Sequence, residues 1–158
     1  MLQAPKTLTR RALAFFAVGL VVPTFSALAQ TPAMIVHKDP TCGCCTGWVR
    51  HLKDAGFVVT VEETANLPAV RRRLGVPGDL AACHTAEIAG YVIEGHVPES
   101  AIRQLLQKRP VALGLAVPGM PVGSPGMEGG APQKYDVVLF GKSGRQPFMQ
   151  FVGTKEVS

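Results

Sequence analysis

The stretch MIVHKDPTCGCCTGWV, residues 34–49, decides the fold. Its apolar start, residues 34–37, predicts a short buried strand, and Asp39 or Thr41 in the following turn is placed to cap a helix. Three of the chain's four cysteines then fall within residues 42–45, between that strand and that helix. Packing rarely needs so many thiols in one place, whereas disulfide exchange and the binding of soft metal ions both use them.

Helical and strand-like segments alternate after the cysteines. Apolar residues at helical spacing over residues 45–55 predict a helix that a glycine ends, and the β-branched run 57–61 predicts the next strand. Residues 67–74, with an asparagine before them and a proline near their start, predict a second helix. Residues 88–94 predict another strand, and residues 99–107 predict a third helix. This β-α-β-α order predicts an α/β sheet with the cysteines at the carboxyl end of its first strand.

The last third of the chain has a different character. Residues 114–132 hold so many prolines and glycines that they predict a shaped loop rather than a regular element. Residues 135–140 and 147–152 flank a Gly-Lys-Ser-Gly turn and predict an antiparallel hairpin. Because the sequence contains no internal repeat or interdomain linker, we expect residues 30–158 to form one domain.

The first residues predict an export signal rather than part of the fold. Three positive charges precede an apolar run, residues 12–22, that is too short to cross a bilayer as a helix. A small-residue cleavage pattern follows, so residues 1–29 are predicted to be a signal peptide with Gln30 as the new N-terminus. The adjacent Arg10 and Arg11 leave both the Sec and the twin-arginine routes open. We expect a periplasmic protein that has no membrane attachment after cleavage.

The basic character of the chain comes partly from this segment. Its removal lowers the formal net charge from +5 to +2, since it carries three basic residues and no acidic one. The basic cluster that remains, residues 71–73, lies in a predicted helix. One tryptophan and two tyrosines provide little aromatic surface to accompany it. Binding of nucleic acid is therefore not expected.

Cys42 and Cys45 have the C-x-x-C spacing of a redox-active pair. At the start of a helix, the unpaired N–H groups and the positive dipole end favour the thiolate of Cys42, with Cys45 as the resolving thiol. Cys44 has no use in simple disulfide exchange, but Cu(I) accepts two or three thiolates, and bridging sulfurs can gather several ions. The cluster therefore predicts a thiol couple, Cys42 and Cys45, within a soft-metal site.

Other soft donors could complete such a site. Cys83 is a leftover thiol that needs some partner in an exported protein, and His84 stands beside it. Met120 and Met127 could add thioethers if the loop rich in proline and glycine folds over the start of the helix. Methionine is more often a gap-filling core residue, however. The other histidines, His37, His51 and His96, are expected at surface or capping positions, and His96, just before a Val-Pro pair, is singled out among them.

Three further uses of the cysteines are open. In an oxidising compartment they could form two structural disulfides, although a domain of this length does not need them and the adjacent Cys44 and Cys45 compete for one partner. A structural zinc site normally uses two separated pairs of ligands, whereas three cysteines crowd one turn here. An iron–sulfur cluster fits poorly for the same reason and because export is expected.

Several segments carry a resemblance to a known family. The resemblance extends over about residues 33–152, and its motifs are specific in combination. The segments that carry it are residues 39–48, 83–86, 90–98, 114–121 and 126–128. They are similar to the CopG-type proteins of bacterial copper-resistance clusters, which are unrelated to the ribbon-helix-helix repressors of the same name. The resemblance implies an exported thioredoxin-like domain that binds copper through its cysteine cluster and acts as an oxidoreductase in copper handling. The matching positions are Cys42, Cys44, Cys45 and Cys83.

The same resemblance refines the expected architecture. Residues 83–110 would form an inserted strand–helix segment between the second helix and the C-terminal hairpin. That hairpin would then supply the last two strands of the thioredoxin-like core. Such folds commonly place a cis-proline beside the C-x-x-C pair, and Pro121 is the candidate.

The leading hypothesis is a periplasmic copper-binding thiol oxidoreductase that interconverts Cu(I) and Cu(II). It prefers Cu(I) and has room for more than one ion, with metal ligands drawn from Cys42, Cys44, Cys45, Cys83, His84, Met120 and Met127. Two alternatives stay open: a non-catalytic copper chaperone or buffer, and a metal-free disulfide oxidoreductase. The sequence therefore does not decide whether the protein is an enzyme. Its expected partners are copper ions and other periplasmic copper-handling proteins.

Overall fold

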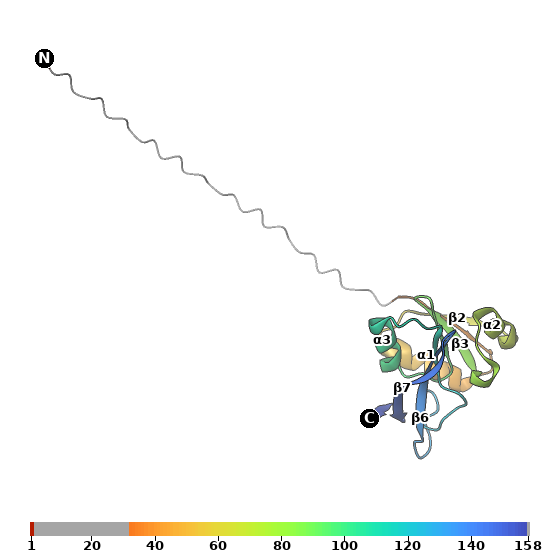
Figure 1. The fold of residues 1–158 in the computed structure, drawn as a ribbon. Coiled ribbons are helices and arrows are strands. Elements are labelled where there is room, and N and C mark those ends of the chain that lie inside the picture. The colour runs from red at the N-terminus through yellow and green to blue at the C-terminus, as the bar shows by residue number, and fades with distance from the viewer. Residues whose placement is uncertain (2–31, 158) are drawn as a thin grey trace.

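A computed structural model describes Met1 and residues 32–157 (Figure 1). The predicted signal peptide, Met1 apart, and its cleavage site lie outside the described residues. The helices are α1 (Gly43–Asp54), α2 (Leu67–Leu74), α3 (Glu99–Lys108) and the short 3-10 helix η1 (Gly78–Leu80). The strands are β1 (Met34–Lys38), β2 (Val59–Glu63), β3 (His84–Ile88), β4 (Tyr91–Glu94), β5 (Gly114–Ala116), β6 (Lys134–Gly141), β7 (Gly144–Val152) and β8 (Lys155–Val157). The fold is therefore mixed α/β.

All eight strands belong to one sheet, in the order β2-β1-β3-β4-β5-β6-β7-β8. β1 is parallel to β2 and β4 is parallel to β5, whereas the other neighbouring pairs are antiparallel. The pairing of β1 with β3 aligns Lys38 with His84. The residue just before β3 therefore lies beside the loop that leads from β1 into α1.

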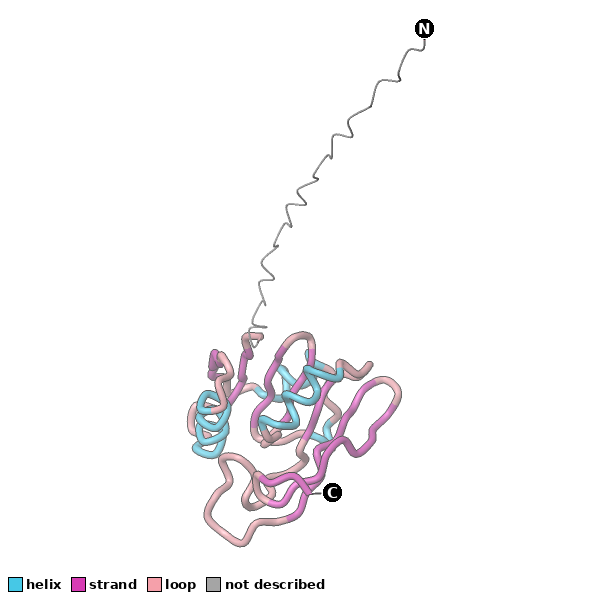
Figure 2. Tube along the Cα trace, turned by 90° about the vertical axis from the view of Figure 1, so that its left-hand side faces the viewer, coloured by secondary structure: helices cyan, strands magenta, loops and turns pink. Residues whose placement is uncertain are grey.

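Helices cover both faces of the sheet. Trp48 and Leu52 of α1 and Ile102 of α3 are fully buried in the main core on one face. Leu74 of α2 packs on the opposite face, against a smaller buried cluster that includes Val92. The long loop between β5 and β6 lies at the bottom of Figure 2, next to the last strands. None of the helices among the described residues is long and apolar enough to cross a membrane.

The structure confirms several predicted elements and changes others. α2 begins and ends as predicted, with Asn66 as its N-cap and Gly75 in the left-handed conformation after its last turn. The predicted single strand 88–94 is wrong, because Ala89 and Gly90 turn the chain with φ values of 50° and 86° and separate β3 from β4. The predicted loop is also shorter than expected, since residues 114–116 form β5.

The prediction that residues 83–110 form an insertion is wrong. They contain β3 and β4, which follow β1 in the sheet, and α3, which covers the main core. The predicted hairpin is present as β6 and β7, but it lies beyond β5 and does not supply the strands next to β1. The prediction of a cis bond at Pro121 is wrong as well, because no peptide bond within residues 32–157 is cis.

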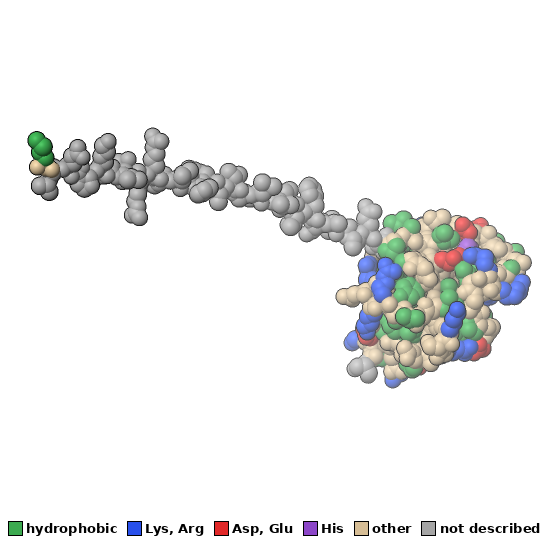
Figure 3. All heavy atoms as spheres, turned by 45° about the horizontal axis from the view of Figure 1, so that its top comes forward, with side chains coloured by type: hydrophobic (Ala, Val, Ile, Leu, Met, Phe, Trp, Pro, Cys, Tyr) green, Lys and Arg blue, Asp and Glu red, His purple; other side chains and the backbone are tan. Residues whose placement is uncertain are grey.

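Charged side chains are dispersed over the surface. On the face drawn in Figure 3, lysine and arginine side chains lie in separate groups among apolar and acidic ones. Several arginines of the described part are held in ion pairs, among them Arg73 with Glu87 and Arg145 with Asp79. This face carries no continuous basic stripe of the kind that tracks a phosphate backbone.

Candidate metal and thiol site

The cysteine cluster opens helix α1. Cys42 is the N-cap residue, with φ and ψ of −74° and 98°, and its Sγ accepts the N–H of Cys45 at 3.3 Å. Asp39 holds the preceding turn instead, accepting the N–H of Thr41 at 2.8 Å and its hydroxyl at 2.5 Å. The prediction that Asp39 or Thr41 caps the helix is therefore wrong. The positive end of the helix dipole faces the Cys42 sulfur.

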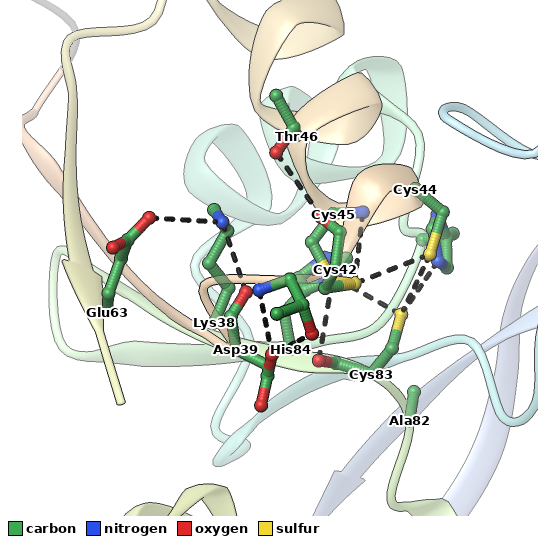
Figure 4. The surroundings of a disulfide bond; sticks show 12 residues. Lys38, Asp39, Cys42, Cys44, Cys45, Thr46, Glu63, Ala82, Cys83 and His84 are labelled. Carbon is green, nitrogen blue, oxygen red and sulfur yellow. Dashed lines mark hydrogen bonds and ion pairs between the residues drawn. A yellow bond between two sulfur atoms is a disulfide. The ribbon is translucent and has the colours of Figure 1, made fainter. Parts of the chain in front are cut away.

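Cys42 and Cys45 are joined by a disulfide across a Cα–Cα distance of 5.4 Å (Figure 4). Cys45 is fully buried, whereas Cys42 is only partly buried and lies at the outer end of the pair. Cys44 remains a free thiol, and its Sγ lies 3.5 Å from that of Cys42. The turn therefore presents one accessible disulfide sulfur with a free thiol beside it.

Cys83 comes to this cluster from the position just before β3. Its Sγ lies 3.9 Å from that of Cys44, and its carbonyl oxygen lies 3.4 Å from the Sγ of Cys45. The four sulfur atoms all fall within 4.8 Å of one another. The structure thus brings together the four cysteines named from sequence, although the last is 38 residues from Cys45 along the chain.

Two histidines extend the cluster inward from Cys83. The Nε2 of His96 lies 2.9 Å from the Cys83 Sγ, and the Nδ1 of His84 lies 3.5 Å from it. His96 Nδ1 lies 2.7 Å from the Pro125 carbonyl. Because a carbonyl only accepts, His96 carries its proton on Nδ1 and turns the Nε2 lone pair toward the sulfur.

His84 is buried without full hydrogen bonding. Its ring lies 4.2 Å from the Trp48 ring and 5.0 Å from the His96 ring, measured between centroids. Its Nε2 finds no hydrogen-bond partner among the residues that the structure describes. Trp48 itself is fixed by a 2.8 Å hydrogen bond from its Nε1 to the Val97 carbonyl. A buried nitrogen without a partner is costly, and at functional sites it often marks a place for a ligand or ion.

Burial keeps this inner part of the site neutral. It raises the pKa of the Cys83 thiol to about 12, with the nearby Cys44 as a further cause. It lowers the pKa of His84 well below the ordinary value, helped by the neighbouring His96, and it lowers the pKa of His96 as well. A thiol and two neutral imidazoles are the forms that a metal cation meets there, and binding a cation at Cys83 releases the thiol proton.

The loop between β5 and β6 packs against the start of α1. Gly126, with φ of 85°, lies so close that a Cβ there would meet the Cys44 carbonyl oxygen at 2.4 Å and the Trp48 nitrogen at 2.6 Å. This contact brings the neighbouring Met127 to the helix start. Met120 is 54% exposed and lines a surface hollow with Pro118 and other residues.

The comparisons with known proteins agree with this geometry. Two solved structures, "Copper resistance protein copG- Form 1" and "Form 2", are each 46% identical to the chain. The first covers 78% of this chain and 99% of its own, the second covers 77% and 98%, and both have a TM-score of 0.72. The chain belongs to the CopG family of copper resistance proteins. A family model described as "Protein of unknown function, DUF411" matches residues 80–127, and the comparison with curated proteins finds no match. The family and the cysteine cluster together support a copper-related function.

Sequence reasoning missed His96 and Trp48. His96 was expected at the surface or as a cap, but it is buried and is the nearest nitrogen to the Cys83 sulfur. Trp48 was expected only as a core residue of the helix, but it also holds the ring of His84. The signal for His96 was its place in the Gly-His-Val-Pro segment of the family resemblance. Local periodicity alone carries no information on either contact.

Proposed function

We propose that this CopG protein binds copper at its cysteine cluster and exchanges electrons between copper and the Cys42–Cys45 pair. The observation that carries the proposal is the meeting of a disulfide and two free thiols in one site, with all four sulfurs within 4.8 Å of one another. A pair that stores two electrons thus lies in contact with donors that suit a soft metal.

Copper ions are the proposed substrate of the protein. Cu(I) prefers thiolate, thioether and imidazole ligands, which are the groups gathered here, and four thiols can bridge more than one ion. The proposed ligands are the four cysteines with His84, to which the geometry adds His96. The proposed thioether donors are Met127 and, earlier in the same loop, Met120. The burial of His84 and the position of its Nδ1, 3.5 Å from the Cys83 Sγ, support a nitrogen ligand here.

The proposed reaction balances over two copper ions. In one direction, two Cu(I) ions give one electron each to the disulfide, whose S–S bond breaks, and two protons complete the two thiols. In the other direction, the dithiol reduces two Cu(II) ions, the S–S bond forms and two protons leave. Cys42 takes the role of the reacting sulfur, because it is the more accessible of the pair and caps α1. Cys45 is its buried partner, while Cys44 and Cys83 hold the metal beside them.

We also propose a thioredoxin-like core and a periplasmic location. Residues 34–108 run β-α-β-α-β-β-α, and the first four strands lie in the order β2-β1-β3-β4 with the C-x-x-C at the start of the first helix. The strands β5–β8 then form an extension of that core. Residues 1–29 are the proposed signal peptide, which would leave one exported domain, residues 30–158.

A copper buffer without turnover is the second candidate. Cys44 and Cys83 are free thiols beside two buried imidazoles, a donor set that could hold Cu(I) even while the Cys42–Cys45 pair is oxidised. Such a protein would bind copper without changing its oxidation state. Redox turnover distinguishes the two candidates.

An anaerobic Cu(I) titration of the reduced protein against a chromogenic chelator tests the shared part of the proposal. We expect two or more tightly held ions per chain. Retention of none would remove copper from the proposal and leave the cluster to disulfide chemistry. The oxidoreductase part is tested by copper-dependent redox turnover in Cys42→Ser. We expect turnover to be lost there and kept in His51→Gln, which changes a histidine of α1 that binds the Glu99 N–H instead of the cluster. Unchanged turnover in Cys42→Ser would favour the buffer.

A further inference from the structure

A buried ion pair lies behind the cysteine cluster. Glu94, at the end of β4, is fully buried, and Arg71 of α2 is 14% exposed. The Nε of Arg71 donates to Glu94 Oε1 at 2.8 Å. Burying a carboxylate and a guanidinium costs so much solvation that an apolar pair of similar volume often stabilises a fold as well or better. Stability alone therefore does not explain why a buried ion pair lies at this position.

The pair holds both backbone groups of one residue. The N–H of Ala82 donates to Glu94 Oε1 at 2.7 Å, and the Nη2 of Arg71 donates to the Ala82 carbonyl. The other carboxylate oxygen accepts the hydroxyl of Thr85 at 2.5 Å. The carbonyl of Ala82 belongs to the peptide that joins it to Cys83. The ion pair thus fixes the peptide plane from which the Cys83 side chain departs, and it fixes the chain again two residues later at Thr85.

Close packing reinforces this hold on Ala82. Gly95, directly after Glu94, has φ of 72°, and a Cβ there would meet the Cβ of Ala82 at 2.6 Å. Its N–H donates to the His84 carbonyl at 3.0 Å. The segment before β3 is therefore held from the side of β4, while the Cys83 sulfur points toward Cys44 (Figure 4). The same sulfur lies 2.9 Å from the Nε2 of His96.

We infer that Arg71 and Glu94 are positioning residues for Cys83, whose sulfur they hold beside that of Cys44 in the proposed copper site. The inference rests on the proposed function and names the residues that set its geometry. Among the described residues, no hydrogen bond joins either side chain to a sulfur of the cluster. Both act through the Ala82 backbone, in the way that outer residues commonly orient the ligands of metal sites.

The chain offers a matched control for Arg71. Arg103 of α3 makes the same two kinds of bond, from its Nε to Glu99 Oε2 at 2.8 Å and from its Nη2 to the Ala55 carbonyl. Ala55 follows the far end of α1 and lies away from the cluster. Arg71→Met and Arg103→Met therefore remove bonds to the same kinds of group, in a buried pair beside Cys83 and in a more exposed pair away from it.

The first measurement does not depend on copper. In protein that keeps its Cys42–Cys45 disulfide, the free thiols Cys44 and Cys83 can be joined by dibromobimane, which fluoresces when it links two neighbouring thiols. Wild type and Arg103→Met should give this crosslink, whereas Arg71→Met and Glu94→Gln should lose most of it. Equal crosslinking in all four proteins would overturn the inference.

The second measurement is the Cu(I) affinity of the reduced protein in competition with a chromogenic chelator. Arg71→Met and Glu94→Gln should bind Cu(I) about 10- to 100-fold more weakly, the usual effect of removing an outer partner of a metal ligand. In a Cys83→Ser background the same changes should have little further effect. A loss of equal size in that background would show that the pair supports the whole fold rather than Cys83, and would overturn the inference.

The two measurements separate the inference from the proposed function. If wild type binds no Cu(I) but the crosslink still depends on Arg71 and Glu94, the copper proposal fails and the positioning of Cys83 stands. If the circular dichroism spectra show that Arg71→Met and Glu94→Gln do not fold, Arg71→Lys tests the positioning of Cys83 instead. It keeps the charge but cannot reach both Glu94 and the Ala82 carbonyl with the same fork of donors. A folded Arg71→Lys with a normal crosslink would overturn the inference.

Discussion

The two ends of the sulfur cluster differ in how the chain builds them. At the start of α1, Cys42, Cys44 and Cys45 are neighbours in sequence, and one turn of backbone sets their spacing. The inner end, formed by Cys83, His84 and His96, depends on the pairing of β1 with β3 and of β3 with β4.

The two ends also differ in burial and in chemistry. The outer turn is partly accessible and carries the disulfide, so partners and reductants can reach it. In the inner end both histidines are fully buried, and the Nε2 of His84 has no partner within the described part of the chain. An accessible sulfur suits exchange, whereas a buried set of neutral donors suits retention of an ion. Changes that affect one end and spare the other therefore test this division.

Trp48→Ala should have the largest effect, because this residue connects the two ends. Trp48 belongs to α1, is fully buried, and packs its ring 4.2 Å from that of His84. Its removal should lower the free energy of unfolding by about 3–5 kcal/mol, as for other large core truncations. Chemical denaturation monitored by far-UV circular dichroism measures the change.

Trp48→Phe is the control for that experiment. It keeps an aromatic ring against His84 and loses the hydrogen bond from Nε1 to the Val97 carbonyl. We expect a cost of about 1–3 kcal/mol from the unpaired carbonyl and the smaller ring. If both variants cost the same, the ring contact with His84 does not hold the two ends together.

Gly126→Ala should have the next largest effect, and it acts on the outer end. The added Cβ would collide with the Cys44 carbonyl and the Trp48 nitrogen, and the residue has a positive φ of 85°. The loop must then lift from α1, at a cost of about 2–3 kcal/mol. Gly119→Ala is matched, since its φ is 73° but nothing lies within 4 Å of the added atom. It should cost only about 1 kcal/mol of backbone strain. Thermal unfolding of the two variants compares them, and equal losses would show that the seat of the loop on α1 contributes little.

The same division explains which parts of the fold could be predicted from sequence. α2 followed from a cap, a proline and a glycine within one stretch of residues, and its ends were correct. β3 and β4 were merged into one strand, because only Gly90 of the two turn residues favours a positive φ, whereas Ala89 at φ of 50° does not. Their place beside β1 was missed for a related reason. Antiparallel pairing of distant segments leaves no local period, so the segment resembled an insertion.

The site was predictable to the same extent. The C-x-C-C turn predicted a thiol and soft-metal site because its three donors are close together in sequence, and Cys83 was added as the remaining thiol. His96 was singled out among the remaining histidines but was expected at a surface or capping position. Only the fold brings it within 2.9 Å of the Cys83 sulfur. The N-cap was missed because cysteine is not among the residues that commonly cap helices.

Acid pH should destabilise the metal-free protein through the inner end. The pKa values of His84 and His96 are lowered in the folded state, mainly by burial, whereas the unfolded chain titrates near the ordinary value of 6.5. Below that pH the unfolded chain binds more protons, so this part of the stability is complete above about pH 6.5 and is lost as the pH falls. Each histidine adds a slope of at most about 1.4 kcal/mol per pH unit.

Urea denaturation of the metal-free protein at a series of pH values measures this slope. His84→Gln should make it shallower by up to one histidine's share. His51→Gln provides the comparison, because burial also lowers the pKa of His51, which lies in the last turn of α1 and outside the inner end. A slope that His84→Gln leaves unchanged would contradict the burial of an uncharged histidine at the inner end.

The two methionines of the loop should give the smallest effect and the finest comparison. Gly126 is in contact with the start of α1, so the backbone of the next residue, Met127, begins beside the helix that carries the cluster, whereas Met120 is 54% exposed. Met127→Leu should therefore weaken Cu(I) retention against a chelator by more than Met120→Leu does. Leucine has nearly the same volume as methionine, so the loss reports on sulfur rather than on packing. Equal losses would mean that the loop closes further over bound copper and brings Met120 in as well. Equal retention would mean that thiolates and imidazoles fill the coordination without thioethers, which makes the inner end sufficient for holding the ion.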